Sequence, residues 1–174
     1  MVVLTVLNEN TFINKISEIK NALNFGLYNC ALALTLTIPD VCGKIEFRKE
    51  KNKERYIKWF NKYAKKHFTL LATKLPGEEI VELQWLTAEE CYALRCAVLH
   101  AGDYNVDGVK LNEVQIHAHK RNGENYSHTI RDGKFIDVDV IELCNTLCKA
   151  AEEYYYLIGD KSHFDIDEVR IDTW

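Results

Sequence analysis

The 174-residue chain has little proline and glycine, two and eight residues respectively. With an apolar content of 47%, this scarcity excludes collagen-like, linker-like and disordered sequences. No apolar run approaches the roughly 20 residues needed to cross a bilayer, and residues 1–7 lack the basic segment and small-residue cleavage site of a secretory signal. We therefore expect one soluble, cytoplasmic domain over residues 1–174 with no membrane segment.

Common cofactor and catalytic motifs are also missing. The chain contains no P-loop, dinucleotide-binding G-x-G-x-x-G, nucleophile elbow or H-E-x-x-H motif, so we expect no cofactor. The six cysteines form no C-x-x-C pair, and we expect reduced thiols packed as small hydrophobic side chains. His117 and His119 share a strand face and could ligate a metal together with His128. No suitably spaced carboxylate completes such a set, so we expect no metal site.

The charge is unevenly distributed. The net charge of −4 argues against a polyanion-binding protein, but residues 44–66 contain ten basic and three acidic residues. This segment carries +7 and leaves −11 for the rest of the chain. The overall charge therefore does not exclude binding to nucleic acid.

Apolar periodicity in the first half predicts helices. Residues 11–23 repeat apolar side chains at helical spacing, and residues 27–47 predict a long buried helix that bends or restarts at Pro39. Residues 51–67 form a third helix with basic outer positions and one aromatic seam. The seam predicts core packing, with base stacking as the alternative, and contains Tyr56, Trp59, Phe60 and Tyr63.

Two capping pairs mark helix starts in the second half. Thr87 with Glu90 begins a helix that runs to about residue 100, with Gly102 as its left-handed stop. Asp139 with Glu142 begins the last long helix, which runs to about residue 158.

The segments between these helices predict loops and strands. Residues 70–86 resemble a loop around Pro76-Gly77, and alternation over 109–120 and 127–138 predicts a small β-hairpin at about 112–138. The tail, residues 160–174, is either an edge strand or loose. The expected fold is mainly α, a bundle of about five helices with a small β-hairpin inserted before the last long helix.

Arg95 and His100 are the candidate catalytic residues. At helical spacing, Tyr92 and Arg95 fall in one apolar arc, so Arg95 points into the protein or an interface, where its guanidinium needs an anion. A structural ion pair with Asp40 or Glu46 would meet that need, and a bound phosphate is the functional alternative. His100 lies at the helix end, where a histidine can exchange a proton near neutral pH.

The sequence resembles the HEPN superfamily (higher eukaryotes and prokaryotes nucleotide-binding) over roughly residues 28–150. The resemblance rests on an R-x4-6-H signature at residues 95–100, on residues 38–46 and 55–60, and on their order along the chain. It implies a helical bundle that dimerises so that two Arg/His pairs line one cleft. Active members usually have a polar residue directly after the arginine, whereas this chain has Cys96.

The resemblance implies a metal-independent endoribonuclease of a toxin–antitoxin or abortive-infection type, with an antitoxin or other protein as a possible partner. His100 would act as general acid or base, and Arg95 would hold the phosphate. The basic helix would then bind RNA through Lys58, Lys62, Lys65 and Lys66, unless these charges only solvate its outer face. The alternative function is a non-catalytic helical protein-interaction module in which Arg95 forms a buried structural ion pair.

Overall fold

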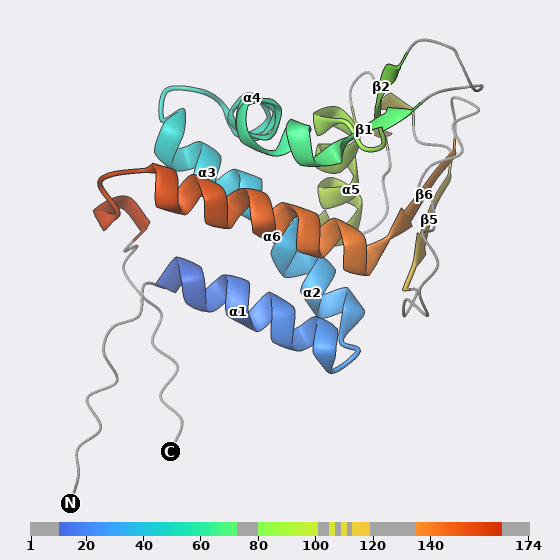
Figure 1. Cartoon of the computed structure of the whole chain (residues 1–174), viewed down its shortest axis with the longest axis horizontal. Helices are drawn as coiled ribbons and strands as arrows, with labels where there is room; N and C mark the ends of the chain where they lie inside the picture. Colours follow the sequence, from blue (N-terminus) through green and yellow to red (C-terminus); the bar gives the residue numbers. More distant parts are fainter. Residues whose placement is uncertain are drawn as a thin grey trace, which may run out of the picture.

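The computed structural model describes residues 11–72, 80–100, 105–106, 109–110, 113–118 and 135–164. Helices make up most of this structure, and the strands β1, β2, β5 and β6 lie at one end (Figure 1). The predicted mainly α fold with a small hairpin before the last long helix is confirmed. In the described part of the chain, no helix has both the length and the apolar character needed to span a membrane.

Three helices form the first half of the bundle: α1 (Thr11–Asn24), α2 (Tyr28–Thr35) and α3 (Ile38–Glu46). Gly26 has a φ of 73°, a left-handed conformation that glycine adopts at little cost, and it turns the chain from α1 into α2. Pro39 lies in the first turn of α3, where its missing N–H costs no intrahelical hydrogen bond. The predicted restart of the 27–47 helix at Pro39 is therefore confirmed.

The basic helix changes its winding along its length. It begins as α4 (Asn52–Trp59), continues as a π-helical turn η1 (Phe60–Ala64), and ends as a 3₁₀ turn η2 (Lys65–Phe68). Its aromatic seam is core, as predicted, since Tyr56, Trp59 and Phe60 are fully buried. These three rings are thus not available for stacking on bases, and the fourth member of the seam, Tyr63, is half-buried.

Residues 70–86 are not a loop, contrary to the prediction. Strands β1 (Thr69–Ala72) and β2 (Val81–Gln84) pair antiparallel, with Thr69 opposite Gln84 and Ala72 opposite Val81. Both strands leave leucines exposed, among them Leu71 and Leu83, so neither has the alternating burial that makes a strand recognisable in sequence.

Two further strand pairs precede the last helix. Strands β3 (Asn105–Val106) and β4 (Val109–Lys110) form a short antiparallel hairpin. Strands β5 (Glu113–His117) and β6 (Phe135–Asp139) pair in parallel, so the predicted hairpin bounds of about 112–138 are wrong, and the antiparallel hairpin lies earlier, at β3 and β4. Parallel strands need a long connection, which residues 118–134 supply. The expected turn at Asp132-Gly133, the stop at Gly102 and the tail from residue 165 lie outside the described residues.

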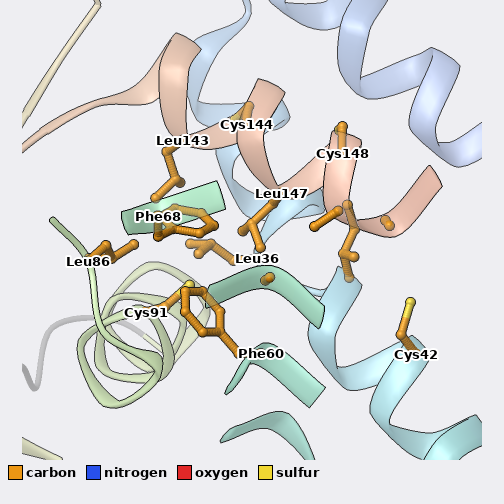
Figure 2. Packing of buried hydrophobic residues seen from close by; sticks show 14 of the residues in the cluster. Leu36, Cys42, Phe60, Phe68, Leu86, Cys91, Leu143, Cys144, Leu147 and Cys148 are labelled. Carbon is orange, nitrogen blue, oxygen red and sulfur yellow. The ribbon is translucent and has the colours of Figure 1, made fainter. Parts of the chain in front are cut away.

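The last long helix, α6 (Val140–Leu157), lies in the middle of the bundle, between α1 on one side and α3 and α4 on the other (Figure 1). The Asp139 side chain caps it by accepting hydrogen bonds from the backbone N–H groups of Ile141 and Glu142, as predicted. Figure 2 shows Leu143 and Leu147 of α6 pointing toward Phe68, Leu86 and Leu36.

The cysteines are free thiols, and four of them pack in the core as predicted. Cys42, Cys91, Cys144 and Cys148 are buried, Cys96 is half-buried and Cys30 is exposed. Figure 2 shows Cys144 and Cys148 on successive turns of α6.

Candidate active site

Helix α5 (Ala88–His100) carries Arg95 and His100, and a local signal determines where it starts. Glu90 N–H donates to Thr87 Oγ1 at 3.2 Å, and Thr87 N–H donates to Glu90 Oε2 at 2.7 Å. This reciprocal capping box confirms the predicted start of the helix. Since α5 is then a continuous helix, Arg95 and His100 lie about one and a half turns apart at its C-terminal end.

The buried face of α5 differs from the predicted arc. Ala93, Leu94 and Ala97 are buried, whereas Leu99 is 36% exposed. Arg95 therefore lies at the margin of the buried face, where its side chain keeps 18% of its surface exposed. This position leaves part of the guanidinium accessible from solvent.

Arg95 forms an ion pair with Asp40 of α3. Its Nε donates to Asp40 Oδ2 at 2.7 Å, and the Asp40 side chain is only 17% exposed. Burial by itself lowers the pKa of Arg95, but the charge and hydrogen bond of Asp40 outweigh it, so the pKa lies above its ordinary value. Asp40 Oδ1 is buried and has no hydrogen-bond partner in the described part of the chain. Arg95 is thus the main source of stabilisation for this carboxylate.

His100 contacts the free end of the same guanidinium. Arg95 Nη1 lies 3.2 Å from His100 Nε2, and His100 is exposed at the rim of the helix, as predicted. A guanidinium can only donate hydrogen bonds, so Nε2 is the acceptor in this contact. The contact therefore corresponds to the tautomer in which Nε2 carries no hydrogen.

Aromatic and thiol side chains support the pair. The Arg95 Cζ lies 5.8 Å from the centre of the Tyr92 ring, and the Tyr92 ring packs edge-on against Tyr56 at 5.2 Å. Burial raises the pKa of Tyr92, and the adjacent Cys96 side chain raises it further, so the Tyr92 hydroxyl is neutral at pH 7. Tyr56 is a supporting residue that the sequence analysis assigned only to the core; its hydroxyl lies 3.3 Å from Cys91 Sγ.

Glu46, the other predicted partner of Arg95, points elsewhere. Its carboxylate accepts hydrogen bonds from Lys62 at 2.6 Å, Tyr63 at 2.8 Å and Tyr154 at 3.4 Å. Asp40 and Glu46 are six residues apart on α3, which places them about 120° apart around the helix. Only Asp40 therefore faces α5, and Glu46 is not part of the Arg95 site.

Three of the four predicted RNA-binding lysines are already paired with carboxylates. Lys58 binds Glu50, Lys62 binds Glu46 at 2.6 Å, and Lys66 binds Glu153 at 2.6 Å. Lys65 is exposed and has no carboxylate partner among the described residues. These ion pairs engage three of the lysines. Glu46 and Glu50 are already counted in the +7 of residues 44–66, so only Glu153 lowers that excess.

The described residues contain no group of three His, Cys, Asp or Glu side chains that could hold a metal ion. Of the histidines considered for such a site, His117 ends strand β5. His119 and His128 lie outside the described residues.

Comparisons of the chain with protein-family models, with curated proteins and with solved structures found no match. The site is therefore interpreted from its own geometry.

Proposed function

We propose that this protein is a metal-independent endoribonuclease of the HEPN kind, acting as a homodimer in a cytoplasmic defence or stress system. The observation that supports this most directly is the contact between Arg95 and His100 at 3.2 Å, combined with the ion pair that Arg95 makes to Asp40 at 2.7 Å. Asp40 engages Nε and leaves the outer guanidinium nitrogens directed at the histidine. A permanent cation and a proton acceptor thus meet at one accessible point.

These two groups fit the cleavage of RNA by its own 2′-hydroxyl. His100 Nε2 takes the proton of the 2′-OH, and the 2′-oxygen attacks the adjacent phosphorus while the bond to the 5′-oxygen breaks. Arg95 stabilises the negative charge on the non-bridging oxygens. The products are a 2′,3′-cyclic phosphate and a 5′-hydroxyl, and no metal ion takes part in the reaction.

The leaving 5′-oxygen also needs a proton, which is the reason to propose a dimer. In an in-line displacement the attacking and leaving oxygens lie on opposite sides of the phosphorus, so one imidazole does not reach both at once. A second copy of the chain would bring its own His100, in the protonated form, to the leaving oxygen. The exposed position of His100 at the end of α5 makes such an approach possible.

RNA binding on the α4 side rests on fewer charges than the sequence suggested. Exposed ion pairs are weak, typically about 0–1 kcal/mol, so a phosphate can compete for Lys58, Lys62 and Lys66. We propose that these lysines and Lys65 contribute a modest, salt-dependent affinity rather than a specific site.

The test is cleavage of a single-stranded RNA in excess EDTA by wild type, His100→Ala and Arg95→Ala. We expect activity in wild type, a loss of about 100- to 10,000-fold for His100→Ala, and a loss of about 100- to 1,000-fold for Arg95→Ala. His67→Ala is a matched control, because His67 is not part of the proposed site. Its Nε2 lies 3.0 Å from Glu153 Oε2. RNA carrying a 2′-deoxy substitution at the cleaved position should resist cleavage.

Two outcomes would refute the nuclease proposal: a folded wild-type protein without EDTA-resistant activity, or activity that His100→Ala leaves unchanged. Circular dichroism of each variant separates loss of chemistry from loss of folding.

A second candidate function is a non-catalytic module that binds another protein. One observation in its favour is the part-buried ion pair between Arg95 and Asp40, because such a pair can stabilise the fold without taking part in catalysis. The other is a set of exposed apolar side chains on the β1–β2 hairpin, which includes Leu71, Ile80 and Leu83. Binding of such a partner, for example an antitoxin, would depend on the leucines of the hairpin. Binding lost in Leu71→Ser and retained in His100→Ala, with no RNA cleavage by wild type, would support this candidate.

A further inference from the structure

A cavity of about 340 Å³ lies where the C-terminal end of α3 meets α4 and the 3₁₀ turn η3 (Ser162–Phe164). We call it the basic pocket, because four of its six lining residues are basic and none of them is a carboxylate. Its described lining consists of Val41, Lys44, Ile45, Arg48, Arg55 and His163. Like charges gathered around one cavity repel each other unless an anion binds between them.

Two cations of the basic pocket differ from the surface lysines in lacking a carboxylate partner among the described residues. Lys44 and Arg55 form no ion pair with any described residue, whereas Lys58, Lys62 and Lys66 on the same helical hairpin each bind a glutamate. Arg55 Nε is, in addition, a buried donor without a hydrogen-bond partner in the described part of the chain. An unsatisfied buried donor of this kind destabilises the empty pocket and favours an acceptor within it.

Helix dipoles explain two of these cations but not the third. Lys44 lies in the last turn of α3, and Arg48 donates from Nε to the carbonyl of Ile45 at 3.4 Å, so both lie where a helix C-terminus attracts positive charge. Arg55 lies near the N-terminal end of α4, where the dipole of its own helix disfavours a cation. Its position is therefore not accounted for by helix capping.

The packing of α3 against α4 holds Arg55 at the pocket. Gly43 has no side chain, and a Cβ atom there would lie 2.7 Å from the backbone oxygen of Arg55. The two helix backbones thus approach closely at this point. Arg55 is consequently presented from a rigid element rather than from a loop.

A larger cavity of about 640 Å³ adjoins the basic pocket and shares Ile45, Arg48 and His163 with it. Its carboxylates include Glu46 and Glu50, which are engaged by Lys62 and Lys58. The third carboxylate, Asp160, lies 3.6 Å from His163. The apolar part of its lining includes Phe47 and Ile158. The two spaces together can hold an anionic group and the organic group attached to it.

We propose that the basic pocket is a phosphate-binding site, in which the guanidinium groups of Arg48 and Arg55 hold a phosphate group with Lys44 and His163 beside them. The group attached to the phosphate would extend into the adjoining cavity. The phosphate can belong to a free phosphorylated small molecule or to an RNA strand, since the recognising chemistry is the same. This site does not depend on catalysis, because its described lining includes neither Arg95 nor His100.

The experiment measures binding of inorganic phosphate, pyrophosphate and two single-stranded RNA oligonucleotides, one with a 5′-phosphate and one with a 5′-hydroxyl, by isothermal titration calorimetry. The full chain is compared with Arg55→Gln and Arg48→Gln. The matched controls are Lys20→Gln and Lys149→Gln, which remove the same charge from exposed surface sites outside both cavities.

We expect pyrophosphate to bind wild type, with an affinity that falls about tenfold or more in Arg55→Gln and Arg48→Gln and changes less than about twofold in the controls. If a free small molecule is the natural source, RNA binding will be equal in wild type and Arg55→Gln. If an RNA strand is the source, both variants will weaken RNA binding, and dependence on the 5′-phosphate will separate an end site from an internal one.

The proposal is overturned if no phosphate-bearing probe binds, or if the controls weaken binding as much as the pocket variants do. Arg48 is exposed, so Arg48→Gln keeps the test valid if Arg55→Gln fails to fold. His100→Ala should bind pyrophosphate as wild type does, which separates failure of this proposal from failure of the proposed nuclease activity.

Discussion

Replacing Gly43 with alanine should destabilise the protein, although Gly43 lies within a helix. In an open helical position this substitution stabilises by about 1 kcal/mol, because alanine has the higher helix propensity. Here the added Cβ would lie 2.7 Å from the carbonyl oxygen and 3.0 Å from the carbonyl carbon of Arg55. Both atoms belong to the backbone, so α3 and α4 must move apart.

Overpacking of this kind costs typically about 1–3 kcal/mol, and contact with a backbone places the cost in the upper part of that range. After the propensity gain is subtracted, we expect Gly43→Ala to lower the free energy of unfolding by about 1–2 kcal/mol. For a domain of this length, such a loss lowers Tm by roughly 2–8 °C.

The assay is urea denaturation followed by circular dichroism, with the m-values compared to confirm that the same transition is measured. Gly159→Ala is the matched control, because a Cβ there meets no atom within 4 Å, and it should change stability by less than about 0.5 kcal/mol. Gly43→Ala as stable as wild type, or more stable, would refute the close approach of α3 and α4.

Three further predictions concern Asp40, Glu46 and the thiols. Asp40→Asn should lower the free energy of unfolding by about 1–3 kcal/mol, because it leaves Arg95 without its counter-ion in a part-buried site; equal denaturation midpoints would contradict the ion pair. Burial raises the pKa of Glu46, but hydrogen bonds from lysine and tyrosine partners outweigh it, so the pKa lies below its ordinary value. The stability gained from this carboxylate is therefore present above the ordinary glutamate pKa of about 4.3 and disappears as pH falls through the lower folded-state value. Glu46→Gln should accordingly be less stable than wild type at pH 7, by about 1–2 kcal/mol, and equally stable in strong acid; a difference that persists in acid would rule out this origin. Burial raises the pKa of Cys91 to about 12, so iodoacetamide at pH 8 should modify the exposed Cys30 and leave Cys91 unmodified in the native protein, as measured by mass spectrometry of peptides.

Local signals were sufficient to predict most helices. These signals are the capping pairs at Thr87 and Asp139 and the proline at position 39. Each acts on backbone groups within a few residues, so its effect on the helix does not depend on tertiary contacts. The hairpin of β1 and β2 was missed because its stability comes from pairing between Thr69 and Gln84 and their neighbours, across residues that show no alternation of burial.

The candidate site was only partly predictable. The sequence placed Arg95 and His100 toward the C-terminal end of one helix, and the structure brings their side chains to 3.2 Å. The choice between Asp40 and Glu46 as the counter-ion of Arg95 could not be made from composition, since both carboxylates lie on α3. It depends on which side of α3 faces α5, a consequence of packing between helices.

For the charge of the basic segment, residues 44–66, the sequence likewise determined one part and the tertiary structure the other. The sequence alone determined that residues 44–66 carry an excess of positive charge, because charge is a property of each side chain. The tertiary structure decided which charges remain available: Lys62 and Lys66 meet glutamates of α3 and α6, whereas Arg55 meets none among the described residues. An ion pair requires two side chains within about 4 Å, and only the folding of distant segments against one another brings them to that distance.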